Sequence, residues 1–438
     1  MNWRAKPLII LGDLAWVTVL GLISGAACVA IRLLFRLLQW LFTGHSGLLS
    51  HAAGALSSWH RVFIPVIGAL AAMAIAELGH RFVKNGSEEY VEAVQKNGGH
   101  ISFIPTLWRT FSSAFSIATG AAIGREGSMI QFATATTSWV GGRFRRSHLP
   151  LATQVACGAA AAVATAYQAP IAGVFFAAEI VMGSLVLPVL PLLLVASLSG
   201  WFISVLLLGR GPLFAVFEMP SVRLRADSTL IFLLLFPVLI GFAGPAYQWL
   251  IRSLRSTSRW PLPLLWSGVL VGVLSLKSTM VWGNGDAALL SMMQSSPAVD
   301  GLLIVLLLRL CATTFCVGTG TVGGVFTPTV FAGGAVGYLL AHLFHVANPL
   351  MAAVLGMGCL LAAATHAPLM AGFMTVELTG QWHLLPMVLV SCAVSWLVAQ
   401  RLSSHSLYGI ATTEPAKDEK DHGYREPSLV TSMPGARD

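Results

Sequence analysis

Charged residues are scarce in this 438-residue chain, because Asp, Glu, Lys and Arg together make up only 10% of it. So few charges cannot cover the surface of a water-soluble protein of this length, and that class is excluded. The basic residues outnumber the acidic ones, 26 to 18, but they are dispersed along the chain. A nucleic-acid-binding surface would need them gathered in one patch, so we expect no nucleic-acid partner.

Cysteine is also rare, and the six cysteines stand singly without the paired spacing of zinc or redox motifs. We expect them to be small buried hydrophobic side chains, with no disulfide and no zinc. The sequence also contains no HExxH, P-loop, GxSxG or carboxylate pair at catalytic spacing, so we expect neither an enzyme nor a cofactor. The cysteines are Cys28, Cys157, Cys311, Cys316, Cys359 and Cys392.

Hydrophobic residues, in contrast, make up 56% of the chain, and its mean hydropathy is +0.76. Long uncharged runs recur almost from end to end, without the alternating pattern of barrel strands. Only helices or a closed barrel satisfy the backbone in lipid, so the sequence predicts an all-α polytopic membrane protein. The runs are 14–31, 149–178, 180–209, 228–251, 260–276, 311–340 and 378–400.

The basic residues that flank these runs predict the orientation of the chain. The first run follows Arg4 and Lys6 and is too long for a signal peptide, so we expect a retained helix. By the positive-inside rule, both termini and two arginine clusters lie in the cytoplasm. The clusters are Arg143, Arg145 and Arg146, and Arg252, Arg255 and Arg259.

The chain is organised as one membrane unit, residues 1–411, followed by a polar tail, residues 412–438, that we expect to be disordered. The membrane unit divides into halves at roughly 8–209 and 228–411. Glycine and proline interrupt several of its hydrophobic runs, and broken helices at membrane depth occur where they line a cavity. The interruptions are Pro170, Gly173, Pro188, Pro191, Gly324 and Pro328.

The segment Gly124–Ser128 places an Arg–Glu pair between two long uncharged runs. A charge in hydrocarbon costs at least about 2.5 kcal/mol, so such a pair generally faces a cavity, a partner or an ion pathway. The flanking glycines let a backbone approach an ion closely, and a helix that began here would offer its free N–H groups to an anion. A packed ion pair within one helix is the alternative interpretation.

A second glycine-containing segment, Gly324–Pro328, stands at the corresponding place in the second half and predicts an inverted repeat. The preceding glycines, Gly318, Gly320 and Gly323, match a dinucleotide-binding fingerprint, but they lie in an uncharged run without a βαβ context. We interpret them as unwound backbone. Gly333, Gly334 and Gly337 would let the following helix pack closely against its neighbours.

Four segments together resemble the ClC family of chloride channels and proton/chloride exchangers, over roughly residues 8–411. Residues 124–128 are similar to the family's GREGP segment, with Ser128 in place of proline, and residues 324–328 fit its GxFxP segment. Residues 170–179 resemble the stretch that ends in a family glutamate. Tyr408 stands where the family has an ion-coordinating tyrosine.

The resemblance implies a fold of about 18 tilted and broken helices in two inverted repeats, and a homodimer with one anion pathway per subunit in a bacterial inner membrane. It implies a gate at Glu126, whose carboxylate would compete with chloride for one site and leave it when protonated. It also implies an anion-binding set made of Asn85, Gly124, Arg125, Gly127, Val325, Phe326 and Tyr408.

Two departures from the family pattern bear on the mechanism. Asn85 replaces a serine that binds chloride in family members, and an amide can still donate to an anion. Ile180 stands where exchangers carry a second glutamate that receives protons, immediately after Glu179. An alkyl side chain carries no proton, so the sequence predicts a passive chloride channel, which the resemblance implies would act as an electrical shunt during acid stress.

Three alternatives remain open. The first is a proton/chloride antiporter. The second is a fluoride-selective exchanger, since that branch also has Asn at the position of Asn85, although Gly86 follows it here. The third is a membrane-embedded enzyme, which would need a second carboxylate or a metal cluster near Glu126. The other ionisable residues in apolar surroundings are expected to be structural: Glu77, Glu179, Glu377 and Arg309.

Overall fold

The computed structural model describes residues 7–83, 86–144, 146–209, 211, 213–214, 228–295 and 297–408. Several of the sequence predictions concern residues outside these ranges, namely Arg4, Lys6, Asn85, Arg145 and the tail 412–438. Within the described ranges the chain is helical, and its only β pairing is an isolated bridge between Gly124 and Gly324. The prediction of an all-α protein is confirmed.

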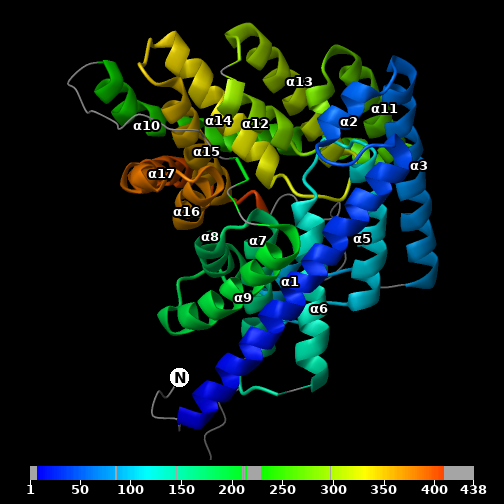
Figure 1. Cartoon of the computed structure of the whole chain (residues 1–438), viewed down its shortest axis with the longest axis vertical. Helices are drawn as coiled ribbons and strands as arrows, with labels where there is room; N and C mark the ends of the chain where they lie inside the picture. The colour runs from blue at the N-terminus through cyan, green and yellow to red at the C-terminus, as the bar shows by residue number, and fades with distance from the viewer. Residues whose placement is uncertain are drawn as a thin grey trace, which may run out of the picture.

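The first half of the chain forms nine α-helices within the described residues (Figure 1). A π-helix, η1, and a 3-10 helix, η2, interrupt their order. The elements are α1 Pro7–Thr43, α2 Leu49–Ala55, α3 Ser58–Phe82, α4 Tyr90–Lys96, α5 Phe103–Ala118, α6 Glu126–Phe144, α7 Leu151–Tyr167, α8 Pro170–Phe175, η1 Phe176–Val181, η2 Leu187–Val189 and α9 Leu190–Leu208.

The second half forms eight α-helices and three short 3-10 helices, η3, η4 and η5, within the described residues. In Figure 1, α6 to α9 lie in the lower part of the molecule and α12 to α15 in the upper part. The elements are α10 Ser228–Ser253, η3 Arg255–Arg259, α11 Pro263–Lys277, η4 Thr279–Val281, α12 Asp286–Ser295, α13 Val299–Gly318, α14 Phe326–Leu343, α15 Pro349–Thr365, α16 Pro368–Thr379, η5 Trp382–Leu384 and α17 Leu385–Leu402.

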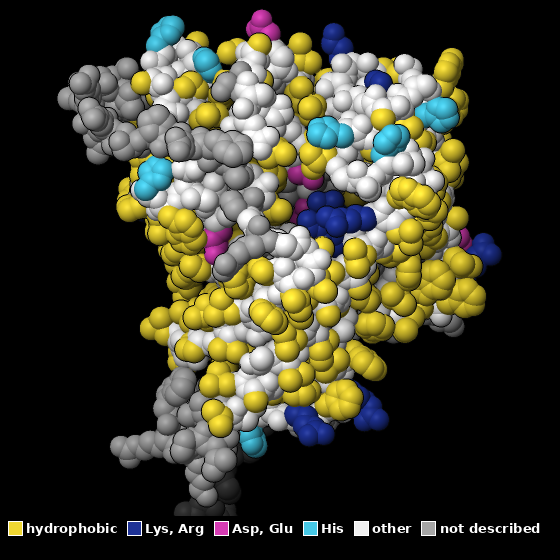
Figure 2. All heavy atoms as spheres, in the orientation of Figure 1, with side chains coloured by type: hydrophobic (Ala, Val, Ile, Leu, Met, Phe, Trp, Pro, Cys, Tyr) yellow, Lys and Arg dark blue, Asp and Glu magenta, His cyan; other side chains and the backbone are white. Residues whose placement is uncertain are grey.

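Seven stretches of the described helices are long and apolar enough to cross a membrane. The helices α7, α11 and α15 are apolar but have only 15 to 17 residues, so they are short for a straight crossing. Figure 2 shows hydrophobic side chains over much of the side of the molecule. The protein is therefore a multi-pass membrane protein. The seven stretches are Leu11–Thr43, Ser58–Phe82, Leu187–Leu208, Leu233–Arg259, Val299–Gly318, Phe326–Leu343 and Trp382–Leu402.

Hydrogen bonds across the molecule relate the two halves by an approximate two-fold repeat. The Ser113 hydroxyl donates to the carbonyl of Val322 at 2.8 Å, and the Thr313 hydroxyl donates to the carbonyl of Ala122 at the same distance. Each donor therefore reaches the loop of the opposite half. Since Gly124 and Gly324 also pair with each other, we conclude that the predicted inverted repeat is present.

The core is built from helices that are buried on every side. In α7 and α15 most side chains are small and fully buried, as expected for helices enclosed by other helices. A Cβ atom on Gly333 of α14 would lie 2.2 Å from the carbonyl of Gly356 in α15, and a Cβ on Gly356 would meet the Gly333 carbonyl equally closely. The prediction that glycines allow close helix packing is confirmed.

The cysteines follow the prediction with one exception. Five are buried, but Cys311 is exposed on α13. Its neighbours one and two turns earlier, Leu307 and Leu303, are exposed as well. The three residues share one face of α13, and that face points away from the core. The prediction for Cys311 was wrong because an apolar run does not reveal which face of its helix packs inward.

Candidate functional site

The two glycine-containing segments meet at the centre of the molecule. The amide of Gly124 donates to the carbonyl of Gly324 at 2.6 Å, and the amide of Gly324 donates back at 2.7 Å. A Cβ atom on Gly127 would lie 2.8 Å from the Gly324 nitrogen. Glycine is therefore required here because the two backbones approach each other too closely for any side chain.

Two helices begin beside this bridge. The helix α6 begins at Glu126, and α14 begins at Phe326, so both N-termini point toward the same region. The first N–H groups of a helix have no partner within it, and its N-terminus carries a partial positive charge of about +0.5. The prediction of a helix start at residues 124–128 is confirmed, and the paired N-termini suit an anion.

Glu126 is almost completely buried, with 6% of its surface exposed. Its oxygen Oε1 accepts a hydrogen bond of 2.7 Å from the side-chain amide of Asn284. The Nε of Arg125 lies 3.8 Å from the same oxygen, and Nη2 of Arg125 lies 3.6 Å from Oδ2 of Asp286. Arg125 and Glu126 do form an ion pair, but it is long, and the short contact of the carboxylate is with a residue from the other half.

A buried arginine fixes the loop that carries Asn284. Arg309 of α13 donates from Nη1 to the carbonyls of Met280 and Val281, at 2.7 and 3.2 Å, and from Nη2 to the carbonyl of Gly283 at 3.0 Å. These bonds hold the loop against α13, and Asn284 and Asp286 follow directly. The structural role predicted for Arg309 is confirmed.

A cavity of about 410 Å³ lies beside the two helix N-termini. Of the predicted anion-binding residues, Gly127, Val325, Phe326 and Tyr408 line it. The other three described members of the predicted site, Gly124, Arg125 and Glu126, are not among its lining residues. Asn85 lies outside the described residues, although Gly86 and Ser87, which follow it, are part of the wall.

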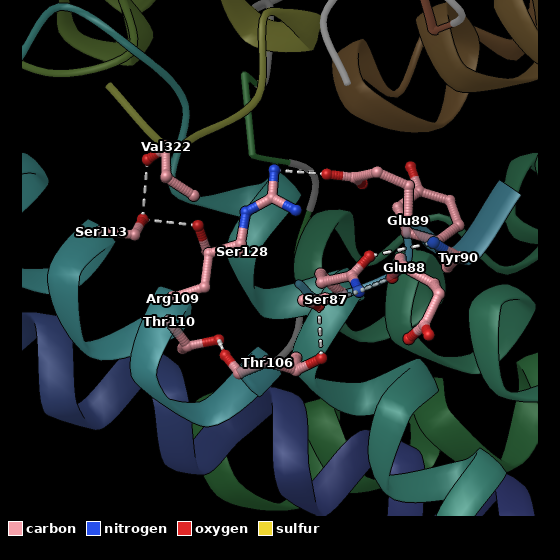
Figure 3. A network of polar contacts seen from close by, with 11 residues as sticks. Ser87, Glu88, Glu89, Tyr90, Thr106, Arg109, Thr110, Ser113, Ser128 and Val322 are labelled. Atoms are coloured by element: carbon pink, nitrogen blue, oxygen red, sulfur yellow. Dashed lines mark hydrogen bonds and ion pairs between the residues drawn. The ribbon is translucent and has the colours of Figure 1, made fainter. Parts of the chain in front are cut away.

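The wall near Gly86 and Ser87 is fixed by hydrogen bonds from α6. Gln131 accepts from the amide of Tyr90 at 3.0 Å and donates to the carbonyl of Glu88 at 2.7 Å. Figure 3 shows this segment together with the ion pair between Arg109 of α5 and Glu89. The side chain of Gln131 therefore sets the position of the segment that follows Asn85 relative to the start of α6.

Ser128, the residue that replaces the family's proline, belongs to the same network (Figure 3). Its hydroxyl lies 2.5 Å from the Ser113 hydroxyl, which donates to the carbonyl of Val322. A proline could not make this contact. The substitution therefore adds a link between the first turn of α6, the helix α5 and the loop before α14.

Two phenol rings border the cavity from different elements. Tyr408 packs edge-on against Phe176, with ring centroids 5.5 Å apart. Tyr167, the last residue of α7, packs against Phe326 at 4.8 Å. Both lie within electrostatic range of Glu126. The cavity thus combines helix N-termini and phenol groups, all of which can donate hydrogen bonds to an anion.

Two glutamates, the partly buried Glu179 and the buried Glu377, bind backbone amides of the opposite half. Glu179 accepts from the amides of Leu369 and Met370, at 3.2 and 2.7 Å, and so caps the N-terminus of α16. Glu377 accepts from the amides of Ile171 and Ala172, at 3.0 and 2.8 Å, and caps α8 in the same way. The structural role predicted for both glutamates is confirmed, and it consists of capping helix N-termini.

The other predicted ionisable position, Glu77, pairs with Arg81 at 3.3 Å on the exposed side of α3. Ile180 is buried in η1, and its carbonyl accepts from Gln95 at 3.1 Å. The segment from Phe176 to Val181 is a π-helix and not the α-helix that the sequence predicted. Glu179 nonetheless points to α16, away from the neighbouring Ile180.

Sequence reasoning missed three residues of this region. Asn284 and Gln131 are ordinary polar residues, and their contacts join positions 158 and 41 residues apart. Tyr167 did carry a signal, because it is the one aromatic residue at the end of a long run of small residues, directly before Gln168, Ala169 and Pro170. A phenol in such a run is unusual and could have been noted.

The sequence profile of the voltage gated chloride channel family matches residues 67–400. That range covers more than half of the chain and contains both helix N-termini of the site. The chain belongs to the ClC family. Among its ClC relatives is the voltage-gated ClC-type chloride channel ClcB of Shigella flexneri, which is 34% identical over 409 residues, covering 89% of this chain and 96% of the relative.

Solved ClC structures share the fold. A slow cyanobacterial Cl⁻/H⁺ antiporter superimposes with a TM-score of 0.79 at 24% identity, covering 91% of this chain and 96% of the other. A CLC-type fluoride/proton antiporter gives a TM-score of 0.75 at 22% identity, covering 94% and 100%. The predicted ClC fold, with its broken helices in two inverted repeats, is confirmed.

Proposed function

We propose that this protein is a passive chloride channel, and that chloride passes through the cavity and past Glu126. The observation that carries the proposal is the meeting of the α6 and α14 N-termini at the Gly124–Gly324 bridge, beside a cavity of about 410 Å³. Partial charges of this kind attract an anion without the tight binding that full charges would cause. The name of the S. flexneri relative, a chloride channel, supports chloride as the permeant ion.

The anion-binding set in this proposal consists of backbone N–H groups around Gly127, Val325 and Phe326, together with Tyr408 and Asn85. Four of these residues line the cavity. Gly124 and Arg125 contribute through the close backbone contact and the positive charge beside it. No single donor would hold the anion strongly, which suits an ion that must also leave.

Glu126 would act as the gate. An ionised carboxylate beside the helix N-termini competes with an anion for the same positive potential, whereas a protonated one does not. Acidification would therefore open the pathway. In a bacterial inner membrane, with both termini in the cytoplasm, such a channel would act as an electrical shunt during acid stress.

Passive conduction is favoured over coupled exchange because of Ile180. A coupled exchanger needs a protonatable relay to Glu126, and an alkyl group supplies none. Glu179 is adjacent, but its two oxygens accept the amides of α16, so its carboxylate is committed to capping. The cyanobacterial fold neighbour is an antiporter, but at 24% identity that likeness concerns the fold alone and favours neither mechanism.

The decisive test is flux through reconstituted protein under separate chloride and proton gradients. Vesicles with a chloride gradient and a clamped potential should not move protons uphill, and the reversal potential should follow chloride alone. Uphill proton movement in the parent protein would contradict the channel and establish the antiporter. A strong preference for fluoride over chloride in the same vesicles would instead support the fluoride-selective exchanger.

The proposal includes a homodimer with one pathway per subunit. Large apolar side chains are exposed on α9 and α17, at Phe202, Leu206, Val390 and Leu397, where either lipid or a second copy could cover them. Chemical crosslinking of the protein in lipid vesicles should yield a dimer. Monomers alone, over a range of protein-to-lipid ratios, would contradict this part of the proposal.

A further inference from the structure

Tyr167 lines the cavity but has no assigned role there. It is the last residue of α7, and its ring packs against Phe326, the first residue of α14. Its side chain lies within electrostatic range of both Glu126 and Tyr408. Tyr167 therefore lies beside one of the two helix N-termini and in the same cavity wall as the predicted anion-coordinating tyrosine.

The hydroxyl of Tyr167 is buried and makes no well-formed hydrogen bond. Only 3% of the residue is exposed, and among the residues that the structure describes its hydroxyl has only a weak contact with the Thr327 hydroxyl. The hydroxyl of Thr327, which follows Phe326 in α14, likewise makes no well-formed hydrogen bond. Leaving a buried hydroxyl without a partner costs about 1–3 kcal/mol, so a structural role would be better served by phenylalanine at position 167.

The surroundings indicate which kind of partner the hydroxyl takes. A phenol can donate one hydrogen bond, and the neighbouring helix N-terminus offers further N–H donors. A group of donors beside a partial positive charge suits an acceptor that is negatively charged. A cation would be repelled by that charge, and an apolar ligand would leave the donors unsatisfied.

We propose that the Tyr167 hydroxyl is a second phenolic donor to the permeant anion, beside the donors already assigned at Tyr408 and the start of α14. This inference rests on the proposed function, since it concerns the same anion site. It adds a donor from α7 to the two side chains already assigned, Asn85 from the first half and Tyr408 from the second.

The repeat itself supports this placement. Gln168 and His366 cap the C-termini of α7 and α15, and both have the left-handed backbone conformation. The residues that precede them are therefore at equivalent positions in the two halves. Those positions are Tyr167 and Thr365, and both line the cavity. The Thr365 hydroxyl, however, donates to the carbonyl of Leu361 at 2.7 Å, which leaves Tyr167 as the uncommitted donor of the pair.

The test is chloride binding to the Tyr167→Phe variant, measured by calorimetry on purified protein. Losing one hydrogen bond should weaken chloride binding about two- to tenfold. The matched control is Tyr247→Phe, because the Tyr247 hydroxyl is also buried but accepts from Thr329 at 3.1 Å and lies outside the cavity. The control should bind chloride as the parent does.

A second measurement separates anion binding from a structural role. Without chloride the Tyr167→Phe variant should unfold at or above the parent's temperature, because it lacks the poorly bonded hydroxyl, and chloride should then stabilise it less than the parent. A loss of stability that is equal with and without chloride would overturn the inference. Unchanged affinity in Tyr167→Phe, with weaker binding in Tyr408→Phe, would also overturn it while leaving the proposed function intact.

If the parent itself binds no chloride, the proposed function fails, and this inference fails with it. Crystals of the parent soaked in bromide give an independent outcome that does not depend on any variant. Anomalous density within hydrogen-bond distance of the Tyr167 oxygen is expected. Bromide bound near Tyr408 but away from Tyr167 would refute the second donor alone.

Discussion

The side-chain amide of Asn284 donates a 2.7 Å hydrogen bond to the carboxylate of Glu126. The two residues come from opposite halves of the repeat, and the loop that carries Asn284 is held in place by Arg309. A hydrogen bond to an ionised carboxylate stabilises the charged form over the neutral one. Asn284 therefore influences the pH at which the proposed gate opens.

Replacing Asn284 with alanine should make the channel open at higher pH. Hydrogen bonds to charged groups contribute about 1.5–3 kcal/mol, so the midpoint of the pH–flux profile should rise by about one to two pH units. Chloride flux from vesicles over a pH series measures the midpoint. In the Glu126→Gln protein, the further substitution Asn284→Ala should leave the pH–flux profile unchanged. A shift of the profile in that background would show that Asn284 acts on another group.

Neutralising Glu126 itself should raise chloride flux at neutral pH and flatten its pH response. Glutamine or alanine removes the charge that protonation removes only transiently. Flux assays of Glu126→Gln and Glu126→Ala from about pH 3 to about pH 8 provide the measurement, because that range extends from below the ordinary glutamate pKa of about 4.3 to above neutral pH. If both the rate and its pH dependence match the parent, Glu126 is not the gate.

Tyr408→Phe and Asn85→Ala should each weaken chloride binding. Removing one donor costs about 0.5–1.5 kcal/mol, or up to roughly 3 kcal/mol if the bond to the anion is charge-assisted. Calorimetry with chloride or bromide gives the affinities, and the Tyr247→Phe protein serves as the control. Parent-like affinity in both variants would place the anion site elsewhere in the molecule.

Glu179→Gln and Glu377→Gln should destabilise the protein by about 1–3 kcal/mol each, because a neutral amide is a weaker acceptor for the helix N-termini that they cap. Glu77→Gln is the matched control, since its partner Arg81 lies on the exposed surface and such pairs contribute at most about 1 kcal/mol. Thermal unfolding in detergent measures all three. Equal stability of the three variants would refute the reciprocal capping as a source of stability.

The membrane class and the two helix starts followed from the sequence for local reasons. Uncharged runs long enough to cross a bilayer predict helices, whatever they pack against. The glycines around Glu126 and before Phe326 predicted that each segment would unwind and then begin a helix, as α6 and α14 do. The order of these motifs, with Tyr408 at the end, was enough to recognise the family.

The exposure of Cys311 and the helix type around Ile180 could not be predicted from the local sequence. Cys311 was expected to be buried, and the segment around Ile180 was expected to be an α-helix, but the first faces outward and the second is a π-helix. Hydrophobic composition is the same on a helix face that meets lipid and on one that meets another helix. The packing of neighbouring helices decides between them, and that information is spread over the whole chain.

The sequence by itself thus determined that this is an all-helical membrane protein with a buried glutamate at a helix start in the first half. The tertiary structure decided what surrounds that glutamate. Asn284 reaches it from 158 residues away, and the Tyr167 hydroxyl ends up without a well-formed hydrogen bond beside Phe326. Hydrophobic patterning and backbone propensity act between near neighbours in the chain, whereas the partner of a buried polar group depends on which distant segments fold against it.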